Sequence, residues 1–212
     1  RWGVFFEALG RENSSGPNIY QTRYVNQLLK SFNRFIPRDS LRGFTTTPLG
    51  LAPSWKKSFS VNHATWAELG KFLGTLPGKE GEVLHLYLAV GYEQKSSGEV
   101  ELLDKEKKAI VLSGMLKDLP VPGRRVFVYL DGCPMGDNQE GVMSEIEVPE
   151  GVVVVAGSSP SCSLEGFSPQ VVPWINEAFL DPQKSARQMG SKKRLSALTS
   201  DLQVAHNLNQ TP

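Results

Sequence analysis

Short runs of consecutive apolar residues alternate along the chain with longer stretches in which apolar residues recur every three or four positions. Four runs have the length and the flanking residues of a strand that is buried on both faces. They cover residues 3–9, 83–90, 125–130 and 152–157. The segment 41–47, LRGFTTT, is a shorter strand candidate. The pattern therefore predicts five strands.

Helical periodicity lies between these runs. Residues 20–35 carry a stripe of apolar side chains, and residues 64–74 repeat the pattern until LPG ends it. Residues 109–119 and 167–180 are two further helix candidates. Helices between apolar strands imply crossover connections, so we expect a three-layer α/β/α sandwich with a mainly parallel sheet.

The remaining segments are predicted as connections. We expect residues 47–62 to form a long loop and residues 91–104 a loop with a short hairpin arm. Residues 137–151 are acidic and rich in turn-forming residues, and residues 182–212 are expected to form a basic and polar tail. The chain shows no internal repeat.

Composition narrows the class of protein. Of the 212 residues, 40% are hydrophobic and 21% charged, and the formal net charge is +1, so no strong charge favours nucleic acid or a membrane surface. No apolar run approaches the roughly 20 residues that span a bilayer. Two cysteines do not make a disulfide scaffold, which favours a reducing, cytoplasmic or otherwise intracellular location.

Chemistry in a parallel sheet is expected at the carboxyl ends of the strands. The loops after Leu9, Val90, Leu130 and Gly157 lie at these ends, and the third of them contains Cys133. A cysteine there is either a nucleophile presented by a glycine-flanked turn or a small buried residue at the end of a strand. The surrounding motif favours the first interpretation.

Residues 131–136, DGCPMG, fit the Asp-x-Cys-x-x-Gly motif of the caspase-like cysteine peptidases (caspases, metacaspases and paracaspases), which the chain resembles. The order of elements over residues 1–181 resembles the same family. The resemblance implies a caspase-like domain with a large-subunit-like part over about 1–136, the acidic connection 137–151, and a small-subunit-like part over 152–181.

The resemblance fails at the catalytic histidine. The family's Gly-His-Gly motif should fall on Val90-Gly91-Tyr92, and no histidine is there. A thiol with a pKa near 8.5 needs a neighbouring imidazole to become a thiolate at neutral pH, and tyrosine, with a pKa near 10, cannot supply that charge. We therefore expect little or no peptidase activity.

Three histidines are elsewhere in the chain. His85 lies within a predicted strand and His206 within the tail. His63 precedes a predicted helix, in a loop on the correct edge of the sheet, and is the one arguable substitute base. An ordinary position at the start of a helix is the simpler interpretation of His63.

The resemblance also implies a substrate pocket and an oxyanion site. Asp131 matches an acid with which metacaspases hold a basic residue, and Ser158 and Ser159 follow the next strand at the same edge. Gly132 and Gly91 would form the turns beside the nucleophile. Cys162 follows the same strand as the two serines, so its thiol is expected at this edge too.

Three functions remain open from sequence alone. The first is a pseudo-protease that binds protein or peptide partners and regulates them, and the second is an active cysteine endopeptidase with Cys133 and an unusual base. The third is a small-molecule-binding α/β domain, although the chain has no phosphate-binding GxxxxGK[ST] or GxGxxG motif. We expect no cofactor, no metal, no nucleic acid and no membrane as partners.

Overall fold

One continuous sheet runs through the computed structural model, which describes residues 1–9, 19–46, 50–78, 81–119, 124–135, 148–158, 196–199 and 202–206. The strands are β1 (Trp2–Glu7), β2 (Leu41–Thr45), β3 (Phe59–Val61), β4 (Val83–Gln94), β5 (Val100–Leu103), β6 (Ala109–Val111), β7 (Arg125–Pro134), β8 (Val152–Ser158), β9 (Ser196–Thr199) and β10 (Leu202–His206). The helices are α1 (Ile19–Phe32), η1, a 3-10 turn (Arg38–Ser40), α2 (Pro53–Lys56), α3 (Trp66–Thr75) and α4 (Leu112–Asp118).

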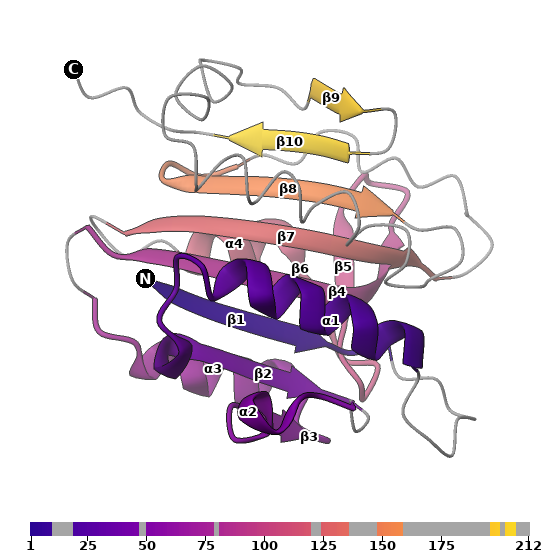
Figure 1. Ribbon diagram of the computed structural model, residues 1–212. Helices are drawn as coiled ribbons and strands as arrows, with labels where there is room; N and C mark the ends of the chain where they lie inside the picture. Colours follow the sequence, from indigo (N-terminus) through magenta and orange to yellow (C-terminus); the bar gives the residue numbers. More distant parts are fainter. Residues whose placement is uncertain are drawn as a thin grey trace.

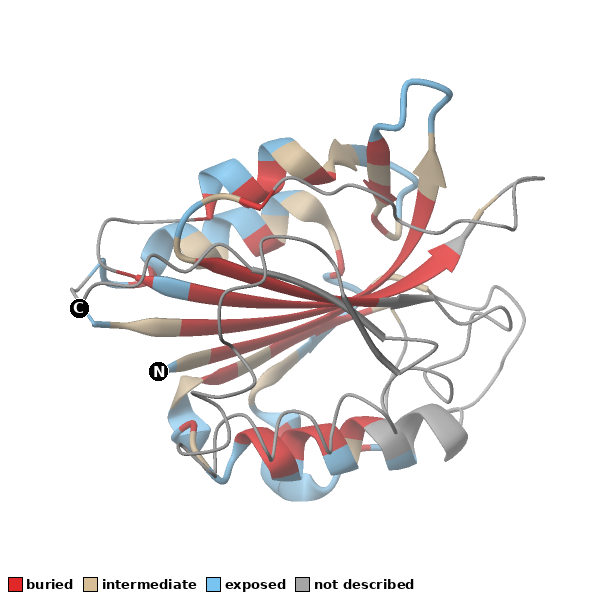
Figure 2. Ribbon diagram, turned by 90° about the horizontal axis from the view of Figure 1, so that it is seen from above, coloured by how far each residue is buried: buried red, intermediate tan, exposed pale blue. Residues whose placement is uncertain are grey.

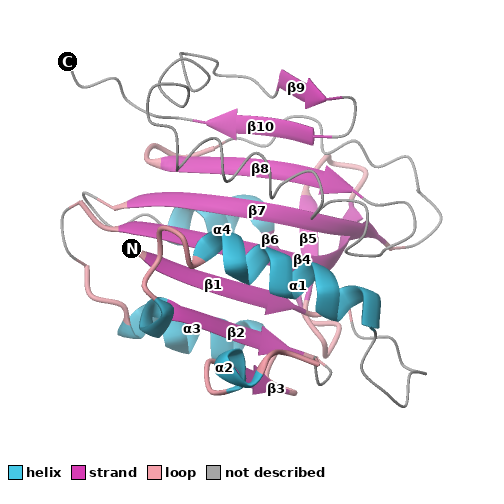
Figure 3. Cartoon of the chain, in the orientation of Figure 1, coloured by secondary structure: helices cyan, strands magenta, loops and turns pink. Residues whose placement is uncertain are grey.

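The strand order across the sheet is β3-β2-β1-β4-β7-β8-β10-β9 (Figures 1 and 3). The first six of these strands are parallel, whereas β10 runs antiparallel to both β8 and β9. The far end of β4 leaves this order and pairs with β5, which pairs with β6. The protein is thus an α/β protein with a mostly parallel sheet.

Described helices cover both faces of the sheet (Figure 2). Side chains of a strand alternate between its faces, so each strand contributes to two cores. Helix α1 packs Val25, Leu28, Leu29 and Phe32 against one core, which also includes Tyr87 of β4. Helices α3 and α4 pack against the other core. We call these the α1 face and the α3–α4 face.

The strong apolar runs predicted the central strands correctly. Strands β1, β2, β4, β7 and β8 and helices α1 and α3 all lie where the pattern placed them. The expected loop over 47–62 was wrong, because it contains α2 and β3. The expected helix over 109–119 begins with the strand β6, whose residues Ala109, Ile110 and Val111 pair with β5.

The end of the chain also differs from the prediction. Residues 196–199 and 202–206 are strands of the sheet rather than parts of a polar tail, since β10 pairs with β8 over four residues. The predicted helix at 167–180 and residues 136–147 of the acidic connection lie outside the described residues. Among the described helices, none is long and apolar enough to cross a membrane.

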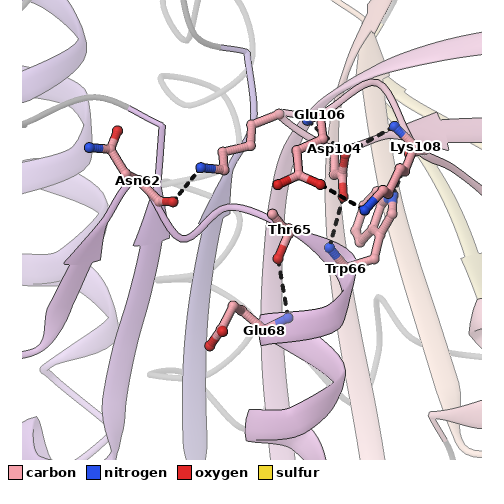
Figure 4. A network of polar contacts seen from close by, with 8 residues as sticks. Asn62, Thr65, Trp66, Glu68, Asp104, Glu106 and Lys108 are labelled. Atoms are coloured by element: carbon pink, nitrogen blue, oxygen red, sulfur yellow. Dashed lines mark hydrogen bonds and ion pairs between the residues drawn. The ribbon is translucent and has the colours of Figure 1, made fainter.

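A buried carboxylate ties the β5–β6 hairpin to the start of α3 (Figure 4). Asp104 accepts hydrogen bonds from the backbone N–H groups of Glu106 and Lys108 within the hairpin, and from that of Trp66 at the start of α3. Thr65 caps the same helix by accepting from the N–H of Glu68. The hairpin therefore holds a fixed position on the α3–α4 face.

Candidate functional site

The carboxyl ends of β1, β4, β7 and β8 meet at one edge of the sheet, as expected for parallel strands (Figure 1). The predicted end of strand β7 at Leu130 was wrong, because the pairing of β7 with β4 continues to Tyr92 and Pro134. Asp131, Gly132 and Cys133 are therefore strand residues. A strand fixes their side-chain directions more firmly than a turn would.

Cys133 lies beside the position where the family resemblance expects histidine. It is in register with Gly91 of the neighbouring strand β4. Residues in register on adjacent strands project from the same face of a sheet, so a side chain at position 91 would lie next to the sulfur of Cys133. Gly91 has no side chain to place there.

Tyr92 does not replace the missing histidine. Its side chain is buried in the core of the α3–α4 face, together with Val100 and Leu102 of the hairpin. Because successive strand residues alternate between faces, Tyr92 points away from the face on which Gly91 and Cys133 lie. Its hydroxyl group therefore does not act on Cys133.

Met135 fills the space beside Gly91. A Cβ atom added to Gly91 would lie 2.9 Å from Cγ and 3.3 Å from Sδ of Met135, which is closer than van der Waals contact allows. The Sδ atom of Met135 also lies 4.0 Å from Sγ of Cys133. A thioether, which neither accepts a proton nor carries charge at neutral pH, thus occupies the place of an imidazole.

The sulfur of Cys133 is not a free thiol. Cys133 is only 4% exposed and is disulfide-bonded, so the nucleophile expected from the sequence is absent in this state. Since a disulfide sulfur carries no proton, its approach to Met135 is a packing contact. The chain has one other cysteine, Cys162, which lies outside the described residues.

None of the three histidines lies beside Cys133. His63 is exposed next to β3, and β3 is four strands from β7, or about 19 Å across the sheet. His85 is in register with Phe127, six residues or about 20 Å before Cys133 along β7. His206 pairs with Val153, which is itself in register with Phe127.

His85 lies within β4, in the strand predicted there, and is a core residue. It is fully buried and stacks on Phe127, and its Nδ1 lies 2.9 Å from the hydroxyl of Tyr129. Burial, with a smaller effect from the charge of Arg1, lowers the pKa of His85 to about 3. The ring is therefore neutral at physiological pH.

Asp131 is a buried acid on the α1 face. It is 2% exposed, and the hydroxyl of Tyr87 donates a hydrogen bond of 3.1 Å to its Oδ2. Burial raises the pKa of Asp131 to about 7, and the hydrogen bond from Tyr87 opposes this only in part. Burial and the nearby Asp131 carboxylate in turn raise the pKa of Tyr87 well above its usual range.

Glu7 is a second buried acid that sequence reasoning did not single out. It is in register with Ala89, which is in register with Asp131, so the two acids belong to one row on one face, with their Cα atoms two strand spacings, or about 10 Å, apart. Its Oε2 accepts hydrogen bonds from the N–H and hydroxyl of Thr46, yet burial still raises its pKa. An acid inside the apolar run GVFFEAL was the available signal.

The remaining predicted site residues are Gly132, Ser158 and Ser159. Gly132 is buried within β7, in register with Val90 and Ser158, so it belongs to the ladder rather than to a turn. The next candidate N–H, that of Met135, donates to the carbonyl of Tyr92. Ser159 lies outside the described residues, and among those described no group of three or more His, Cys, Asp or Glu side chains could hold a metal ion.

Comparison with known proteins does not assign this chain to a family. The sequence matches no protein-family model and no curated protein. The functional interpretation therefore depends on the residues at this edge of the sheet.

Proposed function

We propose that this chain is a caspase-like domain without peptidase activity, a pseudo-protease that acts by binding a protein or peptide partner. The pairing of Gly91 with Cys133 across β4 and β7 is the observation that carries the proposal. These are the positions at which the resemblance expects histidine and cysteine. With glycine at one and a disulfide-bonded cysteine at the other, these two positions supply neither an imidazole nor a thiolate.

The arrangement of elements supports the caspase-like part of the proposal. Helix α1 packs on one face, helices α3 and α4 pack on the other, and the β5–β6 hairpin branches from the strand that carries Gly91. This agrees with the helix, hairpin and strand order on which the resemblance rests.

The acids at the strand ends support a peptide partner with a cationic side chain. Asp131 and Glu7 are both buried on the α1 face, and burial disfavours the charged form of each. A lysine or arginine side chain beside them would stabilise the charged carboxylates and gain an ion pair out of water. Recognition of this kind does not need the missing histidine, because binding and chemistry use different residues.

An intracellular, cytoplasmic location remains part of the proposal on the low cysteine count alone, and the disulfide at Cys133 is an observation against it, because disulfides persist mainly in oxidising compartments. A reducing compartment would open the disulfide at Cys133 and release a thiol. The proposal therefore has to hold for the reduced protein as well. In that form Cys133 still lacks an imidazole, since His63 lies four strands away.

The decisive experiment measures the pH dependence of Cys133 alkylation in the reduced protein with Cys162→Ser as background. We expect a midpoint near or above the free-thiol pKa of about 8.5, because none of the three imidazoles lies beside Cys133 to stabilise a thiolate. The double variant Gly91→His/Met135→Ala should lower that midpoint, since it places an imidazole in the space that Met135 vacates. Tyr92→His is the matched control, on the opposite face, and should leave the midpoint unchanged.

Peptide hydrolysis gives the second measurement. Reduced wild-type protein is expected to cleave none of a panel of fluorogenic peptides ending in Lys, Arg or Asp. Cleavage that disappears in Cys133→Ser would show an active endopeptidase and overturn the proposal. Labelled peptides from the same panel test binding: those with Lys or Arg should bind, and Asp131→Asn should weaken them by about tenfold or more, the loss expected for a charge-assisted hydrogen bond.

A further inference from the structure

A groove lies between α3 and α4, on the face of the sheet opposite to Cys133. It has a volume of about 400 Å³ and is lined mainly by apolar side chains, among them Trp66, Leu73, Ile110 and Met115. This volume falls within the range of small-molecule sites. From Trp66 to Gly74 the wall formed by α3 is about 12 Å long, at 1.5 Å per helical residue.

Two glycines keep this groove open. Gly70 and Gly74 of α3 both line it, both are exposed, and a Cβ added to either would meet no atom within 4 Å. Neither has a positive φ, so the backbone does not require glycine at these positions. Glycine is among the least favourable residues inside a helix, and here neither packing nor conformation compensates. The effect of the two glycines is to leave open space in the groove.

A buried cation with an unused donor lines the same groove. The side chain of Arg124 is 4% exposed, and its Nη2 donates to the carbonyl of Pro77 and to Glu82. Its Nε has no hydrogen-bond partner among the described residues. A buried N–H without an acceptor costs free energy, and a ligand that supplies an acceptor recovers it.

We propose that this groove binds a small amphiphile with an apolar chain or ring and a hydrogen-bond-accepting head group, such as a carboxylate or an amide carbonyl. The apolar body lies along α3 over Gly70 and Gly74, and the head group accepts from Nε of Arg124. The groove is independent of the candidate site around Gly91, Asp131 and Cys133 (the strand-end site), because the sheet lies between the two.

Octanoate and octanamide are suitable probes, with octylamine as the head-group control because its ammonium only donates. All three are compared on Asp118→Asn protein, because Asp118 also lines the groove and its carboxylate would pair with an ammonium. Binding is measured by titration calorimetry, and by the fluorescence of Trp66 with Trp66→Phe as the optical blank. We expect octanoate and octanamide to bind at least tenfold more tightly than octylamine. Failure of both acceptor probes to bind at millimolar concentration, or equal binding of octylamine, would refute the proposal.

A matched pair of glycine variants locates the site. Gly74→Leu fills the groove, whereas Gly114→Leu changes an equally open, exposed glycine of α4 that does not line it. Both should fold, because each replaces a helical glycine with a better helix former into open space. We expect Gly74→Leu to lose at least tenfold in affinity and Gly114→Leu to bind like wild type. Wild-type affinity in Gly74→Leu would show that the ligand binds elsewhere and that the groove is not its site.

Discussion

Two opposing effects act on the pKa of the Asp131 carboxyl group: burial and a hydrogen bond. Asp131 is buried on the α1 face, whose core is apolar, yet its Oδ2 accepts a hydrogen bond from Tyr87. Burial has the larger effect, so the pKa of Asp131 rises from 3.8 to about 7. The group therefore changes charge close to neutral pH while it lies inside the protein.

This pKa predicts how stability depends on pH. Between about pH 4 and pH 7 an Asp131 carboxyl group ionises in the unfolded chain but keeps its proton in the folded one. The free energy of unfolding should therefore fall as pH rises through this window and level off above pH 7, where both states are ionised. Glu7, whose pKa is also raised, adds to the fall.

Asp131→Asn tests the prediction by urea denaturation at pH 5 and pH 8. The variant should lose part of the pH dependence and be more stable than wild type at pH 8, because an amide does not ionise. Asp104→Asn is the control, since Asp104 is buried but accepts three backbone hydrogen bonds. It should destabilise at both pH values. An Asp131→Asn profile parallel to that of wild type would contradict the raised pKa.

At the scale of elements, the hairpin and helix α3 depend on one carboxylate. Replacing Asp104 with alanine leaves three backbone N–H groups without their acceptor. We expect a loss of about 2–4 kcal/mol in the free energy of unfolding, as for a lost cap with buried donors. Chemical denaturation would measure it. Glu106→Ala removes only an exposed ion pair with Lys108 and should change stability little.

The elements that sequence predicted best are those with the strongest local signal. The runs GVFFE, VLHLYLAV and VVVVAG are apolar without interruption, and central parallel strands need that pattern. Strand β3 has three residues, one of them Val61 with 37% exposure, so no apolar run marks it. Strand β10, LQVAH, sits in a polar context and is a strand because β8 offers it a pairing edge.

The residues of the candidate site likewise divide into those with a local sequence signal and those without one. Cys133 and Asp131 were found because they belong to one short motif with fixed spacing. Met135 was not, because its position against Gly91 depends on the register of β4 with β7. Glu7 joins Asp131 only through an intervening strand. Contacts set by register are not visible in a single sequence.

For the whole molecule, the disulfide at Cys133 ties the central strand β7 to another part of the chain. Since Cys162 is the only other cysteine, we expect it to be the partner, and a loop of roughly 30 residues would then stabilise the fold by about 3–4 kcal/mol. Reduction should lower the melting temperature of wild type but not of Cys133→Ser. Mass spectrometry should count no alkylated cysteine before reduction and two after it. Two alkylated cysteines before reduction would disprove the bond.

The pairing of β10 with β8 has a consequence for how the protein is made. The edge of β8, in the apolar run VVVVAG, is covered by residues 202–206, which leave the ribosome some 50 residues later. Until then the hydrophobic edge of β8 can pair with a strand of another chain, and such pairing is a common start of aggregation. A chain cut before Ser196 would keep every residue of the strand-end site, yet we expect it to collect in the insoluble fraction.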